Sequence, residues 1–146
     1  MADRLSPLER SENMRRVKGR DTDPELIVRR ALHAMGLRFR LHRKDLPGRP
    51  DIVLPGRRTV IFVHGCFWHR HEGCRRTTMP AKRQAFWEAK FDRTIARDRE
   101  QIAALNALGW QVAVLWECDV RKPASLRAKL AEIFPDRSSE PEPDER

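Results

Sequence analysis

One short stretch of the chain, HGCFWHRHEGC, concentrates side chains that bind metals or transfer protons. Its cysteines, Cys66 and Cys74, could act together with Cys118 further along the chain. Thiolates and imidazole nitrogens are the usual ligands of a tetrahedral structural zinc ion. The three cysteines with one histidine would complete the set, and the spacing leaves His69 and His71 open as the fourth ligand. We therefore predict a structural zinc site, with ordinary buried and surface thiols as the alternative.

A second set of residues has the chemistry of metal-assisted phosphodiester cleavage. That reaction needs a carboxylate that holds magnesium against the phosphate and a group that activates water. Asp51 begins one apolar segment and His64 ends the next, so the two would meet if the segments pair as strands. Glu25 is a third candidate, and His69, five residues after His64, is a candidate general acid or base. Taken singly, Asp51 could be an ordinary turn residue and Glu25 an ordinary acid at a helix start.

The charge balance indicates a polyanionic partner. Lysine and arginine number 30 against 21 aspartates and glutamates, which gives a net charge of +9. The C-terminal stretch 136–146 is acidic, so the rest of the chain is more basic than this total. Basic domains of this kind often bind nucleic acid, with solvated surface charge as the alternative.

The sequence has the character of an intracellular protein. The N-terminal MADRLSPLERSENMRR has no apolar core, and no apolar run approaches the length that spans a membrane. Three cysteines are an odd number, which in a reducing compartment favours free thiols or metal ligands over disulfides. We therefore expect a cytoplasmic protein without a membrane partner.

Four helices are expected from caps and periodicity. The clearest begins at the cap residues 21–23 and closes at Gly36, and a shorter one is expected over 7–17. A long helix over 82–108, with a possible break near Asp92, and a closing helix over 123–134 follow. The side chains expected in the core are, in the first helix, Leu26, Ile27, Ala31, Leu32 and Met35 and, in the long one, Phe86, Ala89, Phe91, Ile95, Ile102, Leu105 and Leu108.

Four strands are expected between these helices. Alternating residues at 37–42 and apolar segments at 51–54 and 59–63 predict an antiparallel meander. The segment 110–116 is apolar on both faces, which predicts an interior strand. A crossover helix between 59–63 and this strand makes the two parallel, so the cysteines that follow each of them would meet at one edge of the sheet.

Six motifs together resemble those of the very short patch repair (Vsr) DNA mismatch endonucleases. In chain order they are GRPD at 48–51, VIFVHGCFWH at 60–69, FW at 86–87, RD at 97–98, LGW at 108–110 and WEC at 116–118. The resemblance runs from about Ser11 to Cys118 and is most specific in the central motif. It implies a single-domain α/β fold of the PD-(D/E)XK restriction-endonuclease-like type, with a mixed sheet flanked by helices.

The resemblance also implies an activity. Vsr enzymes nick one strand of duplex DNA 5′ to the thymine of a T:G mismatch, which arises when 5-methylcytosine deaminates, and the nick initiates very short patch repair. We therefore expect catalytic Mg²⁺, structural Zn²⁺, double-stranded DNA with a T:G mismatch as substrate, other DNA repair proteins as partners, and a monomer. The alternatives are a zinc-stabilised nucleic-acid-binding module without catalysis and a related nuclease with a different DNA target. A pure binder would have no use for Asp51 and Glu25, because carboxylates repel phosphate.

Carried over to this chain, the resemblance gives roles to five residues. It implies Asp51 as the central magnesium ligand, with the backbone carbonyl of Val63 as another. The general acid or base falls on His69, His64 takes the place where related nucleases carry lysine, and Glu25 falls on an active-site acid. The best-known members are expected to carry threonine at position 63, and a backbone carbonyl survives that difference.

The resemblance assigns the zinc to Cys66, His71, Cys74 and Cys118, although the run 71–74 is one residue longer than in the best-known members. It also assigns DNA contacts to aromatic side chains that enter the base stack, since wedging costs a few kcal/mol and a mismatched step resists least. Core packing is the alternative for these aromatic residues. The residues expected to bind DNA are Phe67, Trp68, Trp87, Met14, Arg15 and Arg16.

Three segments are expected along the chain. Residues 1–20 would form a basic DNA-contacting arm that includes a helix, and residues 21–134 would form the endonuclease domain. Residues 135–146, with the sequence DRSSEPEPDER at their end, would form a disordered acidic tail.

Overall fold

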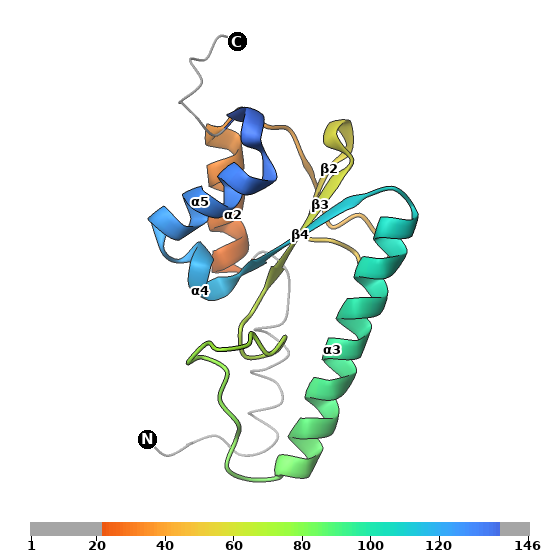
Figure 1. The fold of residues 1–146 in the computed structure, drawn as a ribbon, viewed down its shortest axis with the longest axis vertical. Coiled ribbons are helices and arrows are strands. Elements are labelled where there is room, and N and C mark those ends of the chain that lie inside the picture. The colour runs from red at the N-terminus through yellow and green to blue at the C-terminus, as the bar shows by residue number, and fades with distance from the viewer. Residues whose placement is uncertain (1–21, 138–146) are drawn as a thin grey trace.

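The computed structural model describes residues 22–137, in which a sheet lies between two layers of helix (Figure 1). In chain order the elements are α2 (Asp23–Ala34), β1 (Arg40–Leu41), β2 (Ile52–Leu54), the 3-10 turn η1 (Pro55–Arg57), β3 (Thr59–His64), α3 (Gln84–Ala107), β4 (Gln111–Trp116), α4 (Glu117–Val120), α5 (Pro123–Ile133) and η2 (Pro135–Arg137). The helix expected over 7–17 lies outside the described residues, as do residues 138–146 of the disordered acidic tail expected over 135–146. The first three residues of that tail are ordered instead, because they form η2 and Asp136 pairs with Arg57. None of the helices in 22–137 combines the length and the apolar character that a membrane crossing requires.

The four strands form one mixed sheet in the order β1-β2-β3-β4. β1 pairs with β2 and β2 with β3 in antiparallel fashion, whereas β3 and β4 are parallel. The predicted meander, the parallel crossover and a mixed α/β fold are therefore confirmed. The parallel register sets His64 opposite Trp116, so the chain leaves both strands at the same edge of the sheet.

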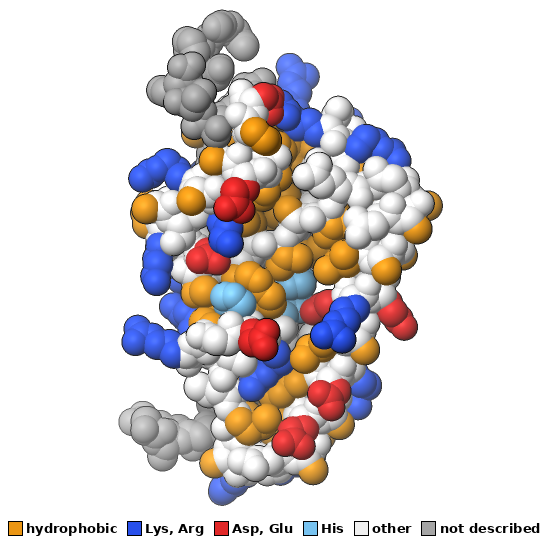
Figure 2. All heavy atoms as spheres, in the orientation of Figure 1, with side chains coloured by type: hydrophobic (Ala, Val, Ile, Leu, Met, Phe, Trp, Pro, Cys, Tyr) orange, Lys and Arg blue, Asp and Glu red, His pale blue; other side chains and the backbone are white. Residues whose placement is uncertain are grey.

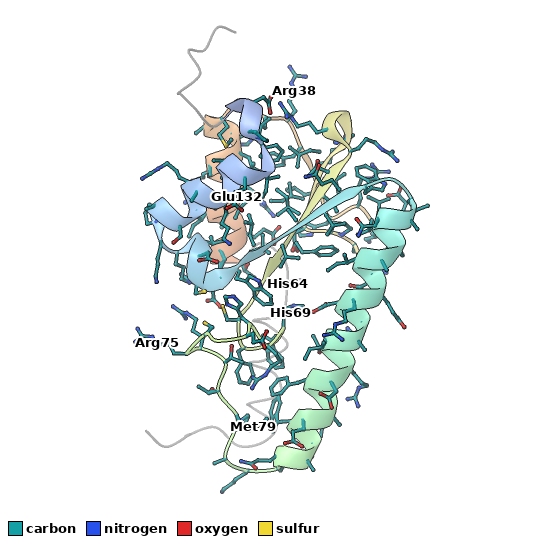
Figure 3. All side chains as sticks on the ribbon, in the orientation of Figure 1. Arg38, His64, His69, Arg75, Met79 and Glu132 are labelled. Carbon is teal, nitrogen blue, oxygen red and sulfur yellow. The ribbon has the colours of Figure 1, made fainter. Side chains whose placement is uncertain are left out.

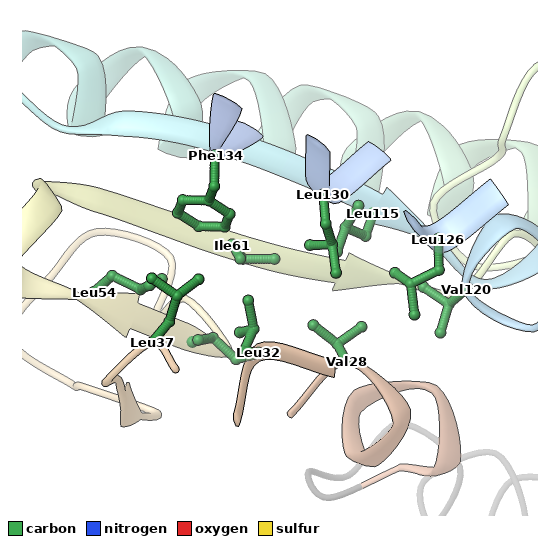
Figure 4. Packing of buried hydrophobic residues seen from close by; sticks show 11 residues of the cluster. Val28, Leu32, Leu37, Leu54, Ile61, Leu115, Val120, Leu126, Leu130 and Phe134 are labelled. Atoms are coloured by element: carbon green, nitrogen blue, oxygen red, sulfur yellow. The ribbon is translucent and has the colours of Figure 1, made fainter. Parts of the chain in front are cut away.

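Two hydrophobic cores cover the two faces of the sheet. The larger core joins the sheet to α2, α4 and α5, and Figure 4 shows its side chains interleaved between these layers. Its buried members are Val28, Leu32, Leu37, Ile52, Leu54, Ile61, Leu115, Val120, Leu126, Leu130 and Phe134. The smaller core joins the other face to α3, where Leu105 packs with Val60 and Trp110. Because both faces are covered, the central strands are apolar throughout.

Helix α2 begins where its cap residues predict. The Thr22 side chain accepts a hydrogen bond from the backbone N–H of Glu25 at 3.4 Å, as an N-cap residue does. Glu25, Val28 and Leu32 are buried, and their spacing puts them on one face of the helix. Leu26, which was expected in the core, is only half-buried. Glu25 therefore points into the protein in the same row as core side chains.

The first strand is shorter than its sequence pattern predicts. The alternation covers 37–42, whereas β1 spans only Arg40–Leu41. Leu37 is buried but reaches the core from a loop. His42 has a φ of 48°, which takes the backbone out of the extended geometry. The alternation of apolar and polar residues predicts which side chains face the core. It does not predict how many residues form backbone hydrogen bonds with a neighbouring strand.

Among the strands of residues 22–137, β4 is the last in the sheet, so the predicted interior position is wrong for this part of the chain. Ala113 and Leu115 pack with the larger core, whereas Val112 and Val114 pack with the core beneath α3. The strand is apolar on both faces because helices cover both faces. A strand can therefore be apolar on both faces without having a neighbouring strand on each side.

Helix α3 is continuous from Gln84 to Ala107, without a break near Asp92. It buries Trp87, Phe91 and Leu105. Three residues that were expected in the core are exposed instead, namely Phe86, Ala89 and Leu108. Figure 1 gives the reason for Phe86 and Ala89, because the N-terminal half of α3 extends past the sheet and lies beside the loop that follows β3.

The turn before β2 requires a glycine at position 48. Gly48 has a φ of 77°, and a Cβ there would lie 2.8 Å from the side-chain oxygen of Gln101 on α3. We predict that Gly48→Ala lowers the free energy of unfolding by about 1–3 kcal/mol, because the left-handed backbone and the contact are both unfavourable for alanine. Urea denaturation of the two proteins measures this difference.

Gly56→Ala is the matched control, because a Cβ at Gly56 meets nothing within 4 Å. It should change the free energy of unfolding by less than about 0.5 kcal/mol. Equal losses in the two variants would contradict a special role for the turn at Gly48.

Candidate functional site

Three groups of metal-binding side chains converge around the C-terminal end of β3 within residues 22–137. In each group, one ligand atom per residue lies within 4.8 Å of the others. The groups are Glu25, His42 and Asp51; His64, His69 and Asp98; and Cys66, His71, Cys74 and Cys118. Figure 2 shows histidine side chains at the surface near the middle of the molecule, with acidic side chains beside them. Most of the predicted site residues therefore lie in one region.

Asp51 connects the turn at 46–50 to β2, and its carboxylate accepts a hydrogen bond from the backbone N–H of Val63 at 2.7 Å. The two residues meet because β2 and β3 are antiparallel. Burial away from water raises the pKa of Asp51 from 3.8 to about 6, the Val63 N–H opposes the increase, and the neighbouring Glu25 adds to it. The site therefore disfavours a second negative charge and favours a cation.

Glu25 lies beside Asp51 and is held by two partners. Its Oε2 atom is 2.8 Å from Nε2 of His42 and 2.5 Å from the Arg29 guanidinium, and its side chain is 3% exposed. His42 was not predicted as a site residue, because the alternation over 37–42 gave it to the polar face of a strand. The left-handed φ of His42 changes the direction of the chain there, and the sequence pattern carried no sign of it.

His69 is oriented by a carboxylate that comes from α3. Its Nδ1 atom lies 2.7 Å from Oδ2 of Asp98. A carboxylate on one ring nitrogen fixes the tautomer and leaves the other nitrogen for proton transfer. Asp98 stands in one of the family-like motifs, but the sequence predicted no role for it. The helix carries several acidic residues, and the local sequence does not distinguish Asp98 from the others.

His64 stacks on His69, with ring centroids 3.7 Å apart and an interplanar angle of 3°. Figure 3 shows the two residues side by side. Burial, and then the neighbouring His69, lower the pKa of His64 from 6.5 to about 3, although Asp98 acts in the opposite direction. His64 is therefore neutral at physiological pH. It would therefore not supply the positive charge of the lysine whose place it is expected to take.

The third group joins the loop after β3 to helix α4. Nδ1 of His71 lies 3.6 Å from Sγ of Cys66 and 3.4 Å from Sγ of Cys118. The backbone N–H of Cys118 also donates to Sγ of Cys66 at 3.4 Å. Of the two histidines that the spacing left open, His71 lies beside the cysteines, and His69 faces Asp98. All three cysteines are free thiols.

Further contacts of His71 stabilise the loop that carries this group. The ring of His71 stacks on Trp116 at a centroid distance of 4.2 Å, and its carbonyl accepts from the hydroxyl of Thr77 at 2.7 Å. Burial raises the pKa of Cys66 to about 12, whereas a hydrogen bond from the backbone N–H of Arg76 lowers the pKa of Cys74. A buried thiol becomes a thiolate ligand readily only when a cation compensates its charge.

Aromatic side chains of the loop and α3 pack in a cluster, with ring centroids 5.2 to 6.1 Å apart. The cluster consists of Phe67, Trp68, Trp87 and Phe91. Phe67 and Trp68 are half-buried, and Trp87 is 7% exposed. Trp87 could therefore reach DNA only if it left the cluster. The other predicted DNA-binding residues, Met14, Arg15 and Arg16, lie outside the described residues.

Known proteins similar to this chain are nucleases. The family model for the DNA mismatch endonuclease Vsr matches residues 2–76. The type II nicking enzyme V.XorIIP of Xanthomonas oryzae pv. oryzae is 53% identical over 134 residues, which cover 92% of this chain and 98% of that protein. The chain belongs to the Vsr family. The DNA mismatch endonuclease Vsr of Escherichia coli (strain K12) is 46% identical over 121 residues, 83% of this chain and 77% of that protein.

Membership of the Vsr family confirms the resemblance drawn from the motifs and makes this protein a DNA endonuclease. The mixed sheet with flanking helices is consistent with the nuclease fold of that family. The E. coli relative is named a mismatch endonuclease, whereas V.XorIIP is named a type II nicking enzyme. The Neisseria meningitidis protein V.NmeAIP, 36% identical over 89% of this chain and 92% of its own length, is also named a type II nicking enzyme. The relatives therefore share DNA cleavage, whereas their names leave room for different DNA targets.

The half-buried carboxylate of Asp51 predicts a pH-dependent stability. Its folded pKa, about 6, lies above its ordinary value of 3.8, so it stabilises the fold fully below pH 3.8 and this contribution is lost as pH rises to about 6. We predict that Asp51→Asn, without added divalent cation, raises the free energy of unfolding by about 2 kcal/mol above pH 7 and by much less at pH 4. Urea denaturation at both pH values measures the difference.

Asp92→Asn, at an exposed position on α3, is the control for the loss of one negative charge. It should leave the difference between the two pH values close to that of the unmodified protein. An Asp51→Asn protein that gains no stability at pH 7 would show that Asp51 is already compensated in the metal-free fold.

Proposed function

We propose that this Vsr-family endonuclease nicks one strand of duplex DNA 5′ to the thymine of a T:G mismatch and so initiates very short patch repair. The E. coli relative bears the name DNA mismatch endonuclease. The strongest structural support is that the half-buried carboxylate of Asp51 lies near the His69–Asp98 pair at the end of β3. Metal-assisted hydrolysis needs both, because one group holds a cation against the phosphate and the other moves a proton.

Asp51 and the backbone carbonyl of Val63 would hold the catalytic Mg²⁺, and Glu25 would bind the ion or one of its waters. Oxygen donors are the ligands that Mg²⁺ prefers. The raised pKa of Asp51, next to a second buried acid, also fits a site that a divalent cation completes. The bound ion would stabilise the negative charge that develops on the scissile phosphate.

His69 would act as the general acid or base of the reaction. Asp98 holds its Nδ1 atom at 2.7 Å, so the Nε2 atom is the one that exchanges a proton with water or with the leaving oxygen. His64 would keep the His69 ring in position by stacking and would serve as a neutral hydrogen-bonding group. The low pKa of His64 supports this division of roles, because it favours the neutral form at physiological pH.

A structural Zn²⁺ held by Cys66, His71, Cys74 and Cys118 would complete the fold of the loop. The four ligand atoms lie within 4.8 Å of one another, and thiolates with one imidazole are a common zinc set. The loop from Gly65 to Arg83 has no helix or strand, so it needs another source of order. A metal at this position would fix the residues between Cys66 and His71, which include His69.

DNA contacts would come from the aromatic cluster and from the N-terminal arm. Phe67 and Trp68 would enter the base stack beside the mismatch, where unstacking costs least, and Trp87 would follow when the cluster opens. Arg70 lies over Phe91 at 3.9 Å and brings a positive charge to the same surface. The basic arm, with Met14, Arg15 and Arg16, would bind the phosphate backbone.

A different DNA target within the same chemistry is the second candidate. Two of the relatives described above are named type II nicking enzymes, including the one that is 53% identical. The flanking bases, or the recognised pair itself, would then differ while Asp51 and His69 keep their roles. The same nicking assay distinguishes the two candidates.

We predict that the full chain with Mg²⁺ nicks a duplex that contains one T:G pair and leaves the matched C:G duplex intact. Asp51→Ala should lower the nicking rate by about 1000-fold or more, because it removes the carboxylate that holds the ion. Duplex affinity should change little, since phosphate contacts come from other residues. End-labelled duplexes with varied flanking sequences, separated on denaturing gels, measure both the rate and the position of the nick.

Asp92→Asn again serves as the control and should nick at the unmodified rate. An Asp51→Ala protein that retains full activity would remove the catalytic assignment. Equal nicking of T:G and C:G duplexes would instead favour a different target. Binding without nicking on every duplex would favour a non-catalytic DNA-binding module.

The zinc proposal predicts about one zinc ion per chain in the purified protein. His71→Asn should lose most of this zinc and unfold at a lower temperature, whereas His69→Asn should keep it, because His69 faces Asp98. Elemental analysis and thermal unfolding measure the two effects. Retention of zinc by His71→Asn, or its absence from the unmodified protein, would contradict the proposed ligand set.

A further inference from the structure

His42 brings a nitrogen atom to a site whose other candidate ligands are oxygens. Its Nε2 atom lies 2.8 Å from Oε2 of Glu25, and one ligand atom each of His42, Glu25 and Asp51 fall within 4.8 Å of one another. All three side chains are buried or half-buried. None of the roles proposed above uses this imidazole.

The spacing of these atoms matches a shared metal ion as well as a hydrogen bond. In an octahedral site with metal–ligand distances of about 2.1 Å, neighbouring ligand atoms lie about 3 Å apart and opposite ones about 4 Å apart. The 2.8 Å between Glu25 and His42 suits neighbouring positions, and the 4.8 Å limit admits Asp51 with a small adjustment.

The backbone at His42 is itself unusual. His42 has a φ of 48°, a left-handed conformation that few non-glycine residues adopt and that histidine tolerates better than most. Its N–H donates to the carbonyl of Asp51 at 3.2 Å, so the residue is tied to the same carboxylate-bearing segment. Strained positions of this kind cluster at binding sites, where the surrounding structure maintains them.

Arg29 explains how the site is stable without a divalent ion. Its guanidinium lies 2.5 Å from Oε2 of Glu25 and 3.4 Å from Nε2 of His42. Arginine has no acceptor atom and cannot bind a metal, so it serves as a counter-charge to Glu25. Arg29 and His42 both contact Oε2 of Glu25, so a divalent ion bound between this oxygen and His42 would displace the Arg29 guanidinium.

We propose that His42 is a direct nitrogen ligand of the divalent cation held by Asp51 and Glu25, and that it makes this site prefer Mn²⁺ to Mg²⁺. The inference rests on the proposed function, which requires a divalent cation at this position. Imidazole nitrogen binds transition metals well, whereas Mg²⁺ prefers oxygen ligands and water. A site of two carboxylates and one imidazole therefore favours Mn²⁺ more than a site of oxygens alone.

Electron paramagnetic resonance of Mn²⁺ bound to the zinc-loaded full chain tests this inference. Pulsed measurements detect the ¹⁴N coupling of a directly bound imidazole, and titration of the free Mn²⁺ signal gives the Kd. His42→Asn is the best variant, because asparagine also tolerates the left-handed backbone and cannot reach as far. His33→Asn is the matched control, since His33 is an exposed histidine near the end of α2.

The unmodified protein and His33→Asn should both show the ¹⁴N coupling. His42→Asn should lose it, and its Kd for Mn²⁺ should rise by about tenfold or more, a loss seen even for outer-shell partners. Its affinity for Mg²⁺, measured by competition, should fall by a smaller factor. Absence of coupling in the unmodified protein, or its persistence in His42→Asn, would overturn the inference and leave His42 as a hydrogen-bond partner of Glu25.

A second variant covers the case in which His42→Asn does not fold. The double variant His64→Asn/His69→Asn leaves His42 as the one histidine among the two groups nearest Asp51, and it should retain the ¹⁴N coupling. Loss of the coupling there would assign the nitrogen to His64 or His69 and would overturn the inference. Nicking of T:G duplexes by the unmodified protein without ¹⁴N coupling rejects the inference alone. Coupling without nicking rejects the proposed function alone.

Discussion

The parallel pairing of β3 with β4 fixes the geometry on which the candidate site depends. Its register sets His64 opposite Trp116, so the segments that follow both strands leave the sheet at one edge. The loop after β3 then places Cys66 beside α4 and His69 beside α3. The antiparallel pairing of β2 with β3 places Asp51 beside Val63. A shift by one residue would turn every side chain of β3 to the opposite face. Packing of both cores therefore selects the site geometry together with the fold.

Helix α3 links the two halves of the site. Its Asp98 contacts His69, and its Gln101, less than one turn further, lies against the Gly48 turn that leads into Asp51. Residues three apart on a helix project to nearly the same side. One rigid element therefore positions both the His69–Asp98 pair and the turn that leads into Asp51.

Local patterns were enough to predict most of the architecture, including the capped start of α2, the meander and the parallel crossover. The errors arose where the answer depends on distant segments. β4 has helices on both faces, so its composition could not reveal that it ends the sheet, and Phe86 is exposed because α3 extends past the sheet. The same limit applies to the site. His42 and Asp98 acquire their importance from Glu25 and His69, which approach them only in the folded chain.

The cluster of three cysteines and His71 draws on parts of the chain that are far apart in sequence, since Cys66 and Cys118 are separated by 52 residues. A nascent chain that has not yet reached β4 presents at most three of the four groups. A metal that needs all four can be retained only after β4 has been synthesised and has docked beside β3. A chain that binds this metal would then have been synthesised at least as far as Cys118. A chain that ends earlier would keep its thiols uncoordinated and reactive.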